Sequence, residues 1–309
     1  MDLLRSIGIT EIVFQLMLVN AILGLSIYLT LYTGMFSLAN AGFMAIGAYV
    51  GVVLTQNYDL PLWAALIGGM LAAGVVAVPI GLPVLRLRDI YLAIATIGFG
   101  EVVRILILNF DTLASSISGE SVQLTRGALG ITGIPKITET WQLLLFLVVT
   151  VYILVRLHRS RFGRAMAAIR QDEQAAATMG INVVYVKNAV FIFSAILAAS
   201  AGVLKAHLTR TISPGDYGFD QVVNILAFAV LGGTSTWLGP IVGGFVLTAL
   251  PEILREFKQY RGIVNGVILL VVIVYLPGGL VNINGWKRLW RRIRGQPSVT
   301  GKIQDAETG

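Results

Sequence analysis

The chain lacks cysteine entirely and has only two histidines, His158 and His207, among its 309 residues. Without cysteine, disulfide frameworks, thiol catalysis and cysteine-ligated metals are excluded, and two histidines argue against a histidine-rich metal centre. Charge is also scarce, because Asp, Glu, Lys and Arg make up 13% of the residues against about 25% in a soluble domain. So few charges cannot cover a globule with polar surface, and the abundant Leu, Ile, Val and Phe exclude disorder. The composition indicates a polytopic membrane protein.

Long charge-free runs give the chain its 56% hydrophobic residues. A membrane-crossing helix needs about 20 mostly apolar residues, because every backbone amide must be satisfied internally. The sequence predicts an all-α, polytopic transmembrane helix bundle of eight or nine spans, the count depending on how a broken segment near residues 231–240 crosses. The predicted spans, all in one domain of residues 1–309, are 12–32, 36–56, 61–82, 90–109, 141–157, 188–206, 220–235, 238–254 and 262–281. The first run is too long for a cleavable signal and is expected to stay as a helix.

The distribution of Lys and Arg predicts the orientation of the chain. With nine spans and the N-terminus outside, 14 of the 23 basic residues fall on the cytoplasmic side and 7 on the outer side. Residues 159–187 and the basic tail 286–309 then lie in the cytoplasm, and the loop 111–140 lies outside. A basic tail beside a membrane anchors topology and lipid headgroups rather than binding nucleic acid, which also accounts for the net charge of +7.

Motifs for enzymatic chemistry are missing from the sequence. There is no phosphate-binding G-x-x-x-x-G-K-S/T loop, no H-E-x-x-H zinc motif and no plausible Ser-His-Asp elbow. We therefore expect no enzyme and no cofactor bound by this chain, so that ATP, if it is used, is hydrolysed by another chain. Intramembrane acids that could carry protons are also lacking, with Glu101 as the one candidate, which argues against an ion-driven carrier.

Residues 160–180 are predicted to form one amphipathic helix on the cytoplasmic side. Ser160 can cap its start, alanines fill it, and Gly180 suits the left-handed residue that follows a helix. An alanine-surfaced helix fits into the groove of another protein. The pattern also fits a helix that lies on the membrane surface, and the sequence pattern alone leaves both interpretations open.

Polar and helix-breaking residues at membrane depth mark candidates for a translocation path. Glu101 and Arg104 are three residues apart on a helix and can face one another. Charges at this depth form either a gate or a packing salt bridge, and both stay open. A break in a helix is tolerated only where protein or a water-filled cavity surrounds it. The path candidates are Ser37, Asn40, Thr96, Glu101 and Arg104, and the predicted break is at Gly232, Gly233, Gly239 and Pro240.

Four blocks of the sequence, in this order, resemble the branched-chain amino acid ABC-transporter permeases of the LivH/LivM type, and more closely LivM. The blocks are residues 34–49, 81–101, 160–182, and 230–233 together with Gly239-Pro240. The third block resembles the coupling segment of the family, which docks on the nucleotide-binding subunit. The resemblance implies that the ATPase contacts are Arg164, Ile169, Glu173, Ala175, Ala176 and Gly180.

The same resemblance implies the assembly in which the chain works. It would be one transmembrane subunit of an importer in the bacterial cytoplasmic (inner) membrane, with a homologous permease, two ABC ATPase subunits that bind ATP and Mg, and an external substrate-binding protein. Branched-chain or other neutral amino acids would be the substrates. Similar permeases carry urea or short amides, which is the alternative, and an ion-coupled secondary transporter is a more distant one.

Overall fold

The computed structural model describes residues 10–119, 123–253 and 279–281. Each of the first eight predicted spans contains a helix, whereas most of the ninth, 262–281, and the tail 286–309 lie outside the described residues. The helices are α2 (Glu11–Tyr32), α3 (Asn40–Asn57), α4 (Leu62–Val84), α5 (Asp89–Ser118), α6 (Thr140–Arg159), α7 (Arg161–Gln171), α8 (Glu173–Thr178), α9 (Val183–Thr209), α10 (Phe219–Gly232) and α11 (Leu238–Ile253).

Five of the described helices, α2, α4, α5, α6 and α9, are long and apolar enough to cross a membrane. The protein is thus a multi-pass membrane protein built as a helix bundle. Two of the five are central, since 78% of the most apolar stretch of α2 and 72% of that of α9 are buried. The corresponding shares are 33% for α4, 28% for α5 and 17% for α6, so these three helices present large apolar side chains outward.

Small residues allow α3 and α9 to pack backbone against backbone in the centre. A Cβ atom at Gly47 would collide with the backbone of Ala199, and one at Gly202 would collide with the backbone of Met44. Such close approach is typical of membrane helices, where small side chains let dispersion forces act over a long contact. Gly47 therefore serves packing within the chain.

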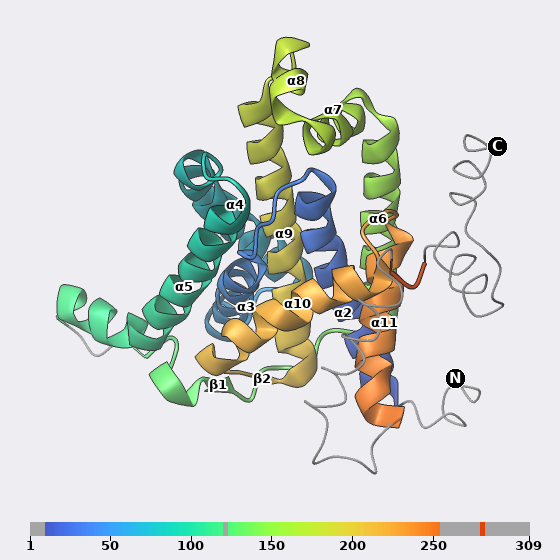
Figure 1. Ribbon diagram of the computed structural model, residues 1–309. Coiled ribbons are helices and arrows are strands. Elements are labelled where there is room, and N and C mark those ends of the chain that lie inside the picture. The colour runs from blue at the N-terminus through green and yellow to red at the C-terminus, as the bar shows by residue number, and fades with distance from the viewer. Residues whose placement is uncertain (1–9, 120–122, 254–278, 282–309) are drawn as a thin grey trace, which may run out of the picture.

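The helices α10 and α11 are short and pack antiparallel to one another, and we call them the re-entrant pair. The 14 residues of α10 rise about 21 Å, less than the hydrocarbon thickness of about 30 Å. Pro240 packs against Gly24 and Gly244 against Ala21, so α11 runs antiparallel to α2, back toward the end from which α10 started (Figure 1). The structure does not confirm the two crossings that the sequence predicts at 220–235 and 238–254.

The turn between α10 and α11 contains the predicted break. The helix stops at Gly232, because Gly233 has a φ of +100° and ends the regular hydrogen bonding. Leu280 N donates to Leu231 O at 2.9 Å and Val281 N donates to Gly232 O at 3.2 Å. The amides of Leu280 and Val281 thus satisfy carbonyl groups that the end of α10 leaves free. Within the membrane, such a break needs this kind of cover from the protein.

The two ends of the bundle differ in structure (Figure 1). At one end lie α7 and α8. At the other, β1 (Ile131–Thr132) pairs antiparallel with β2 (Thr211–Ile212), beside the short 3-10 helices η1 (Gly127–Leu129) and η2 (Pro214–Tyr217). This small ribbon is the one departure from an all-helical fold within the described residues. We call the α7–α8 end cytoplasmic and the β1–β2 end outer, following the predicted orientation.

The predicted single helix over 160–180 is wrong, because the structure divides it at Asp172 into α7 and α8. Asp172 has extended backbone angles, φ −156° and ψ 114°. Its Oδ1 accepts hydrogen bonds from the amides of Gln174, at 2.8 Å, and Ala175, at 2.9 Å. An Asp side chain that bonds the backbone in this way competes with the continuing helix and starts a new one. The predicted cap at Ser160 is present, since Ser160 Oγ accepts from Gly163 N at 3.2 Å.

Candidate functional site

A buried polar cluster joins the central helices α2, α3 and α9. Asn40, the first residue of α3, donates from Nδ2 to Ser26 Oγ at 2.8 Å and to Ser194 Oγ at 3.0 Å. The hydroxyl of Ser194 donates to Ser26 O at 2.7 Å, and that of Ser26 donates to Leu23 O at 2.7 Å. We call Ser26, Asn40 and Ser194 the inner polar cluster. Each of its donors has an acceptor, so it links three helices without an unsatisfied hydrogen.

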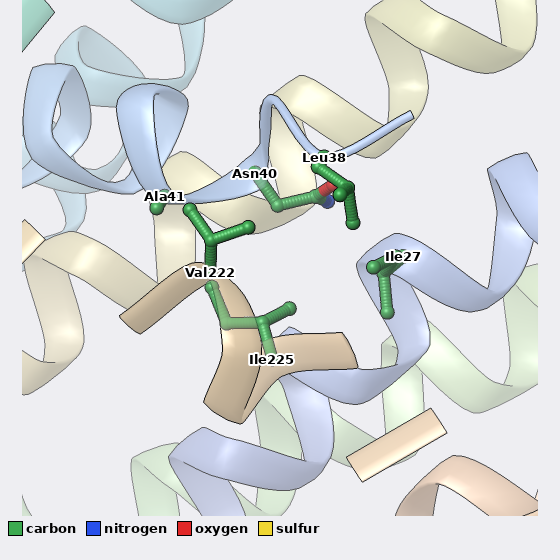
Figure 2. Close-up of a pocket in the computed structure, with 6 residues that line it drawn as sticks. All are labelled: Ile27, Leu38, Asn40, Ala41, Val222 and Ile225. Atoms are coloured by element: carbon green, nitrogen blue, oxygen red, sulfur yellow. The ribbon is translucent and has the colours of Figure 1, made fainter. Parts of the chain in front are cut away.

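A narrow pocket lies beside the inner polar cluster, between α2, the start of α3 and α10. Figure 2 shows the six residues that line it, Ile27, Leu38, Asn40, Ala41, Val222 and Ile225. The space between these residues amounts to about 120 Å³, including space that is open to solvent, and it is not wide enough for a water molecule. Five of the six lining side chains are apolar, so the pocket would have to widen before an aliphatic group could enter and contact them. The structure therefore shows this part of the bundle closed.

Three of the predicted path residues lie at this level of the protein. Thr96 Oγ1 accepts a hydrogen bond from Leu38 N at 2.9 Å and thereby fixes the segment that leads into α3. Ser37 is buried, and its hydroxyl has no partner among the described residues. The structure thus brings Thr96 to the turn that contains Ser37 and Asn40, although Thr96 lies more than 50 residues away in the sequence.

Glu101 and Arg104 lie apart from that group, on the outward face of α5. Arg104 Nε donates to Glu101 Oε1 at 2.8 Å, and a second guanidinium nitrogen contacts the same oxygen. The side chain of Glu101 is 42% exposed and that of Arg104 is 29% exposed. Their neighbours Val102 and Ile105 are exposed and apolar. The structure therefore shows an ion pair at the surface of the described chain, next to a surface that suits lipid or another protein.

The cytoplasmic segment presents part of the predicted docking set and buries another part. Arg164, Ala175 and Gly180 are exposed, and Gly180 has the left-handed φ of +84° that its position requires. Ile169 and Ala176 are instead buried against the bundle. They support the segment from behind and do not reach its surface.

Glu173 holds the segment to the central helix α9. Its Oε2 lies 2.6 Å from Lys187 Nζ, and the Lys187 side chain is 10% exposed. Glu173 thereby fixes α8 on the end of α9. Glu173 therefore makes a contact within the chain, in addition to the docking role that the sequence predicts for it.

The end of α7 rests on the turn between α2 and α3, a contact that the sequence did not predict. The Arg170 guanidinium lies 6.0 Å from the centroid of the Tyr32 ring, and His158 packs edge-on against the same ring at 4.4 Å. A Cβ atom at Gly34 would lie 3.1 Å from Arg170 Cα, and the φ of Gly34 is +82°. The cytoplasmic segment therefore contacts the chain six residues before Asn40.

A second polar cluster, also missed from the sequence, lies between the middle of α3, the outer end of α9 and η2. Tyr49 packs against Tyr217 of η2, with ring centroids 6.1 Å apart. Asp216 lies within electrostatic range of Tyr49 and of Lys205. Burial raises the pKa of Tyr217 well above its usual value, and Tyr49 and Asp216 add to this shift, so the Tyr217 hydroxyl stays protonated. We call Tyr49, Lys205, Asp216 and Tyr217 the outer polar cluster. Its one signal in the sequence is Lys205, a charge at the end of an apolar run.

Comparisons with known proteins place these features in a family. The family described as "Branched-chain amino acid transport system / permease component" matches residues 9–276. The high-affinity branched-chain amino acid transport system permease protein LivM of Escherichia coli (strain K12) is 32% identical over 297 residues, 85% of this chain and 65% of that protein. LivM of Salmonella typhimurium is 31% identical over 296 residues, with the same coverage. A probable branched-chain amino acid transport permease protein LivH of Methanocaldococcus jannaschii is 23% identical over 305 residues, 91% of this chain and 93% of that protein.

The chain thus spans about two thirds of the length of the two LivM proteins, 65% in each case. No solved structure matches it.

Proposed function

The chain belongs to the branched-chain amino acid transport permease family, and from this premise we propose that it is the transmembrane subunit of an ATP-driven importer. It carries branched-chain or other neutral amino acids across the bacterial cytoplasmic (inner) membrane. ATP and Mg bind to partner subunits, and this chain holds no cofactor and catalyses no reaction of its own. Urea or a short amide is the alternative cargo.

The observation that carries this proposal is the cytoplasmic segment α7–α8. Its inner face is fixed to the bundle by Ile169, Ala176 and the Glu173–Lys187 pair. Its outer face presents small side chains, such as that of Ala175, beside the charge of Arg164. A rigid, small-residue surface lets a partner approach closely, and a motion of that partner would reach the Tyr32–Gly34 turn through Arg170. This is what a permease needs if its ATPase is a separate chain.

The closed pocket supports the assignment of an apolar cargo. Ile27, Val222 and Ile225 offer aliphatic surface from two helices, and Asn40 offers one amide at their edge. Apolar walls with a few fixed polar groups are typical of small-molecule sites. Because α10 belongs to the re-entrant pair, a shift of α10 away from α2 and α3 would open the pocket. Ser37, Asn40 and Thr96 would then border the path.

The exposed ion pair on α5 supports the assignment of a second permease chain as partner. Glu101 is the thirteenth residue of the 30-residue α5, about 18 Å from its start and near the middle of a hydrocarbon layer of about 30 Å. An ion pair in contact with lipid at this depth is costly, so such pairs face protein or a water-filled cavity. We assign that cover to a homologous permease. Two ATPases and an external binding protein complete the proposed complex.

The test is a bulky substitution on the outer face of α8. Ala175→Trp should reduce ATP-driven amino-acid uptake by the complete complex at least about tenfold, because a blocked close contact costs more than about 1.4 kcal/mol, and co-purification with the ATPase should fall. Ala128→Trp, an exposed alanine of η1 at the outer end, is the matched control and should leave both unchanged. Normal uptake and co-purification in Ala175→Trp would refute the docking assignment. Uptake by this chain alone, abolished by an ionophore, would identify an ion-driven carrier instead.

A further inference from the structure

The outer polar cluster contains a buried hydroxyl group with no partner. Tyr49 is 5% exposed, and its hydroxyl oxygen, which is out of contact with solvent, makes no hydrogen bond within the described residues. Burying such a group without a partner costs free energy that a Phe at the same position would not cost. The ring of Tyr49 packs on Tyr217, a contact that Phe would keep. The hydroxyl itself therefore contributes nothing to this closed fold.

Lys205 places a positive charge in the same region. It lies near the outer end of α9, four residues before the helix ends at Thr209. It is within electrostatic range of Asp216, yet among the described residues it forms neither an ion pair nor a side-chain hydrogen bond. Lys187, on the same helix, has such a partner in Glu173. A charge in an apolar helix is retained where it meets a counter-ion or a cargo.

Asp216 supplies the opposite charge on the neighbouring element. Its Oδ2 accepts a hydrogen bond from Ser213 N at 2.8 Å, which fixes the carboxylate at the start of η2. Asp216 is exposed, whereas Tyr49 is buried. The cluster therefore presents a cation and a hydroxyl donor on helices α3 and α9 and an anion on η2.

This arrangement matches the head of an α-amino acid, which carries a carboxylate and an ammonium group on one carbon. We propose that the outer polar cluster is a binding site for the zwitterionic head of the cargo, in which Lys205 and the Tyr49 hydroxyl donate to its carboxylate and Asp216 accepts from its ammonium group. The site rests on the proposed function, because it assigns recognition to residues of the same path.

The outer polar cluster lies closer to the outer end of the bundle than the pocket beside Asn40 does. Tyr49 lies nine residues after Asn40 on α3, about 13 Å farther toward the outer end. A cargo that enters from outside meets the charged site first and the apolar pocket beside Asn40 second. The outer site selects the amino-acid head, and the inner pocket accommodates the side chain after the bundle opens.

Three ligands allow the contribution of each charge of the cargo to binding to be measured separately. L-leucine carries both, leucinamide lacks the carboxylate, and 4-methylpentanoate lacks the ammonium group. Binding of each is measured on the purified complete complex in lipid nanodiscs, without the external binding protein. Lys205→Met and Tyr49→Phe should each weaken the binding of L-leucine and of 4-methylpentanoate at least about tenfold, as expected when a hydrogen bond to a charged group is lost. Neither should weaken leucinamide. Asp216→Asn should weaken the binding of L-leucine and leucinamide, which carry the ammonium group, and should leave 4-methylpentanoate unchanged. Lys205→Arg keeps the positive charge and should restore part of the binding that Lys205→Met loses.

Lys136→Met is the control, because Lys136 is exposed in the outer loop and its loss lowers the charge of the same end equally. The site is refuted if Lys205→Met and Tyr49→Phe bind all three ligands like the wild type. It is also refuted if Lys205→Met weakens binding no more than Lys136→Met does. In both cases ATP-driven uptake by the wild type still upholds the proposed function. If the wild type neither binds nor imports any amino acid, both proposals fall. If it imports urea or an amide but no amino acid, the zwitterion site is refuted and the alternative cargo is upheld.

Discussion

The inner and outer polar clusters lie along the same pair of helices, α3 and α9, yet their hydrogen bonding differs. In the inner cluster, Asn40 donates both amide hydrogens and each serine hydroxyl has an acceptor. In the outer cluster, the Tyr49 hydroxyl has no partner within the described residues and Lys205 has no counter-ion in contact. Satisfied polar groups fix how helices pack, whereas a buried polar group without a partner needs another explanation, which in our proposal is the cargo. The comparison therefore distinguishes a structural role for the inner cluster from the binding role that we propose for the outer one.

The largest expected effect comes from separating α3 and α9, on which both clusters depend. Gly47→Val should lower the free energy of unfolding by about 3 kcal/mol, because its side chain has no room beside the Ala199 backbone. Unfolding in mixed micelles, followed by circular dichroism, measures this. Gly98→Ala is the control, since nothing lies within 4 Å of a Cβ atom there, and it should be neutral or slightly stabilising. A Gly47→Val protein as stable as wild type would show that the two helices are not tightly packed.

A medium effect is expected when the inner cluster is broken. Asn40→Leu should lower the free energy of unfolding by about 1–2 kcal/mol, because two buried hydrogen bonds are lost between helices. A double-mutant cycle with Ser194→Ala isolates the Asn40–Ser194 bond and should give a coupling of about 0.6 kcal/mol, with an upper bound near 1.7 kcal/mol. Zero coupling would mean that this bond does not join α3 to α9, and the contrast between the clusters would disappear.

The smallest effect on stability is expected in the outer cluster. Tyr49→Phe and Lys205→Met should change the free energy of unfolding by less than about 0.5 kcal/mol or should stabilise the protein, because neither removes a satisfied hydrogen bond from the described fold. The same unfolding assay applies, with no ligand present. A loss comparable with that of Asn40→Leu would show that the outer cluster is structural and would remove its distinction from the inner one.

The prediction from the sequence succeeded where local pattern decides the outcome. Apolar runs gave helices in the first eight predicted spans, and the Ser160 cap and the left-handed Gly180 were read correctly from residue type. The single helix over 160–180 failed for a local reason as well. Asp172 followed by Glu173 is a helix-start signal in its own right, and the alanine-rich periodicity on both sides obscured it.

Other features depended on contacts between distant parts of the chain. The re-entrant course of α10 and α11 follows from Gly24 meeting Pro240 and from Leu280 covering the end of α10, neither of which a hydropathy pattern reports. The sequence offered no strong reason to predict a role for Ser194, yet Ser194 accepts a hydrogen bond from Asn40. Nothing in the sequence distinguished Tyr49, because the sequence pattern of a tyrosine in an apolar helix does not depend on whether its hydroxyl has an acceptor.

By itself the sequence determined that this is a helical membrane protein of the branched-chain amino acid permease family, because apolar run length, scarce charge and short motifs are local properties. The tertiary structure decided which polar groups of the described residues are satisfied and which are not, that α11 runs back along α2 after α10 ends, and which face of the cytoplasmic segment is exposed. These depend on where distant side chains meet, and hydrogen-bond partners, burial and close packing exist only once helices far apart in the chain come together.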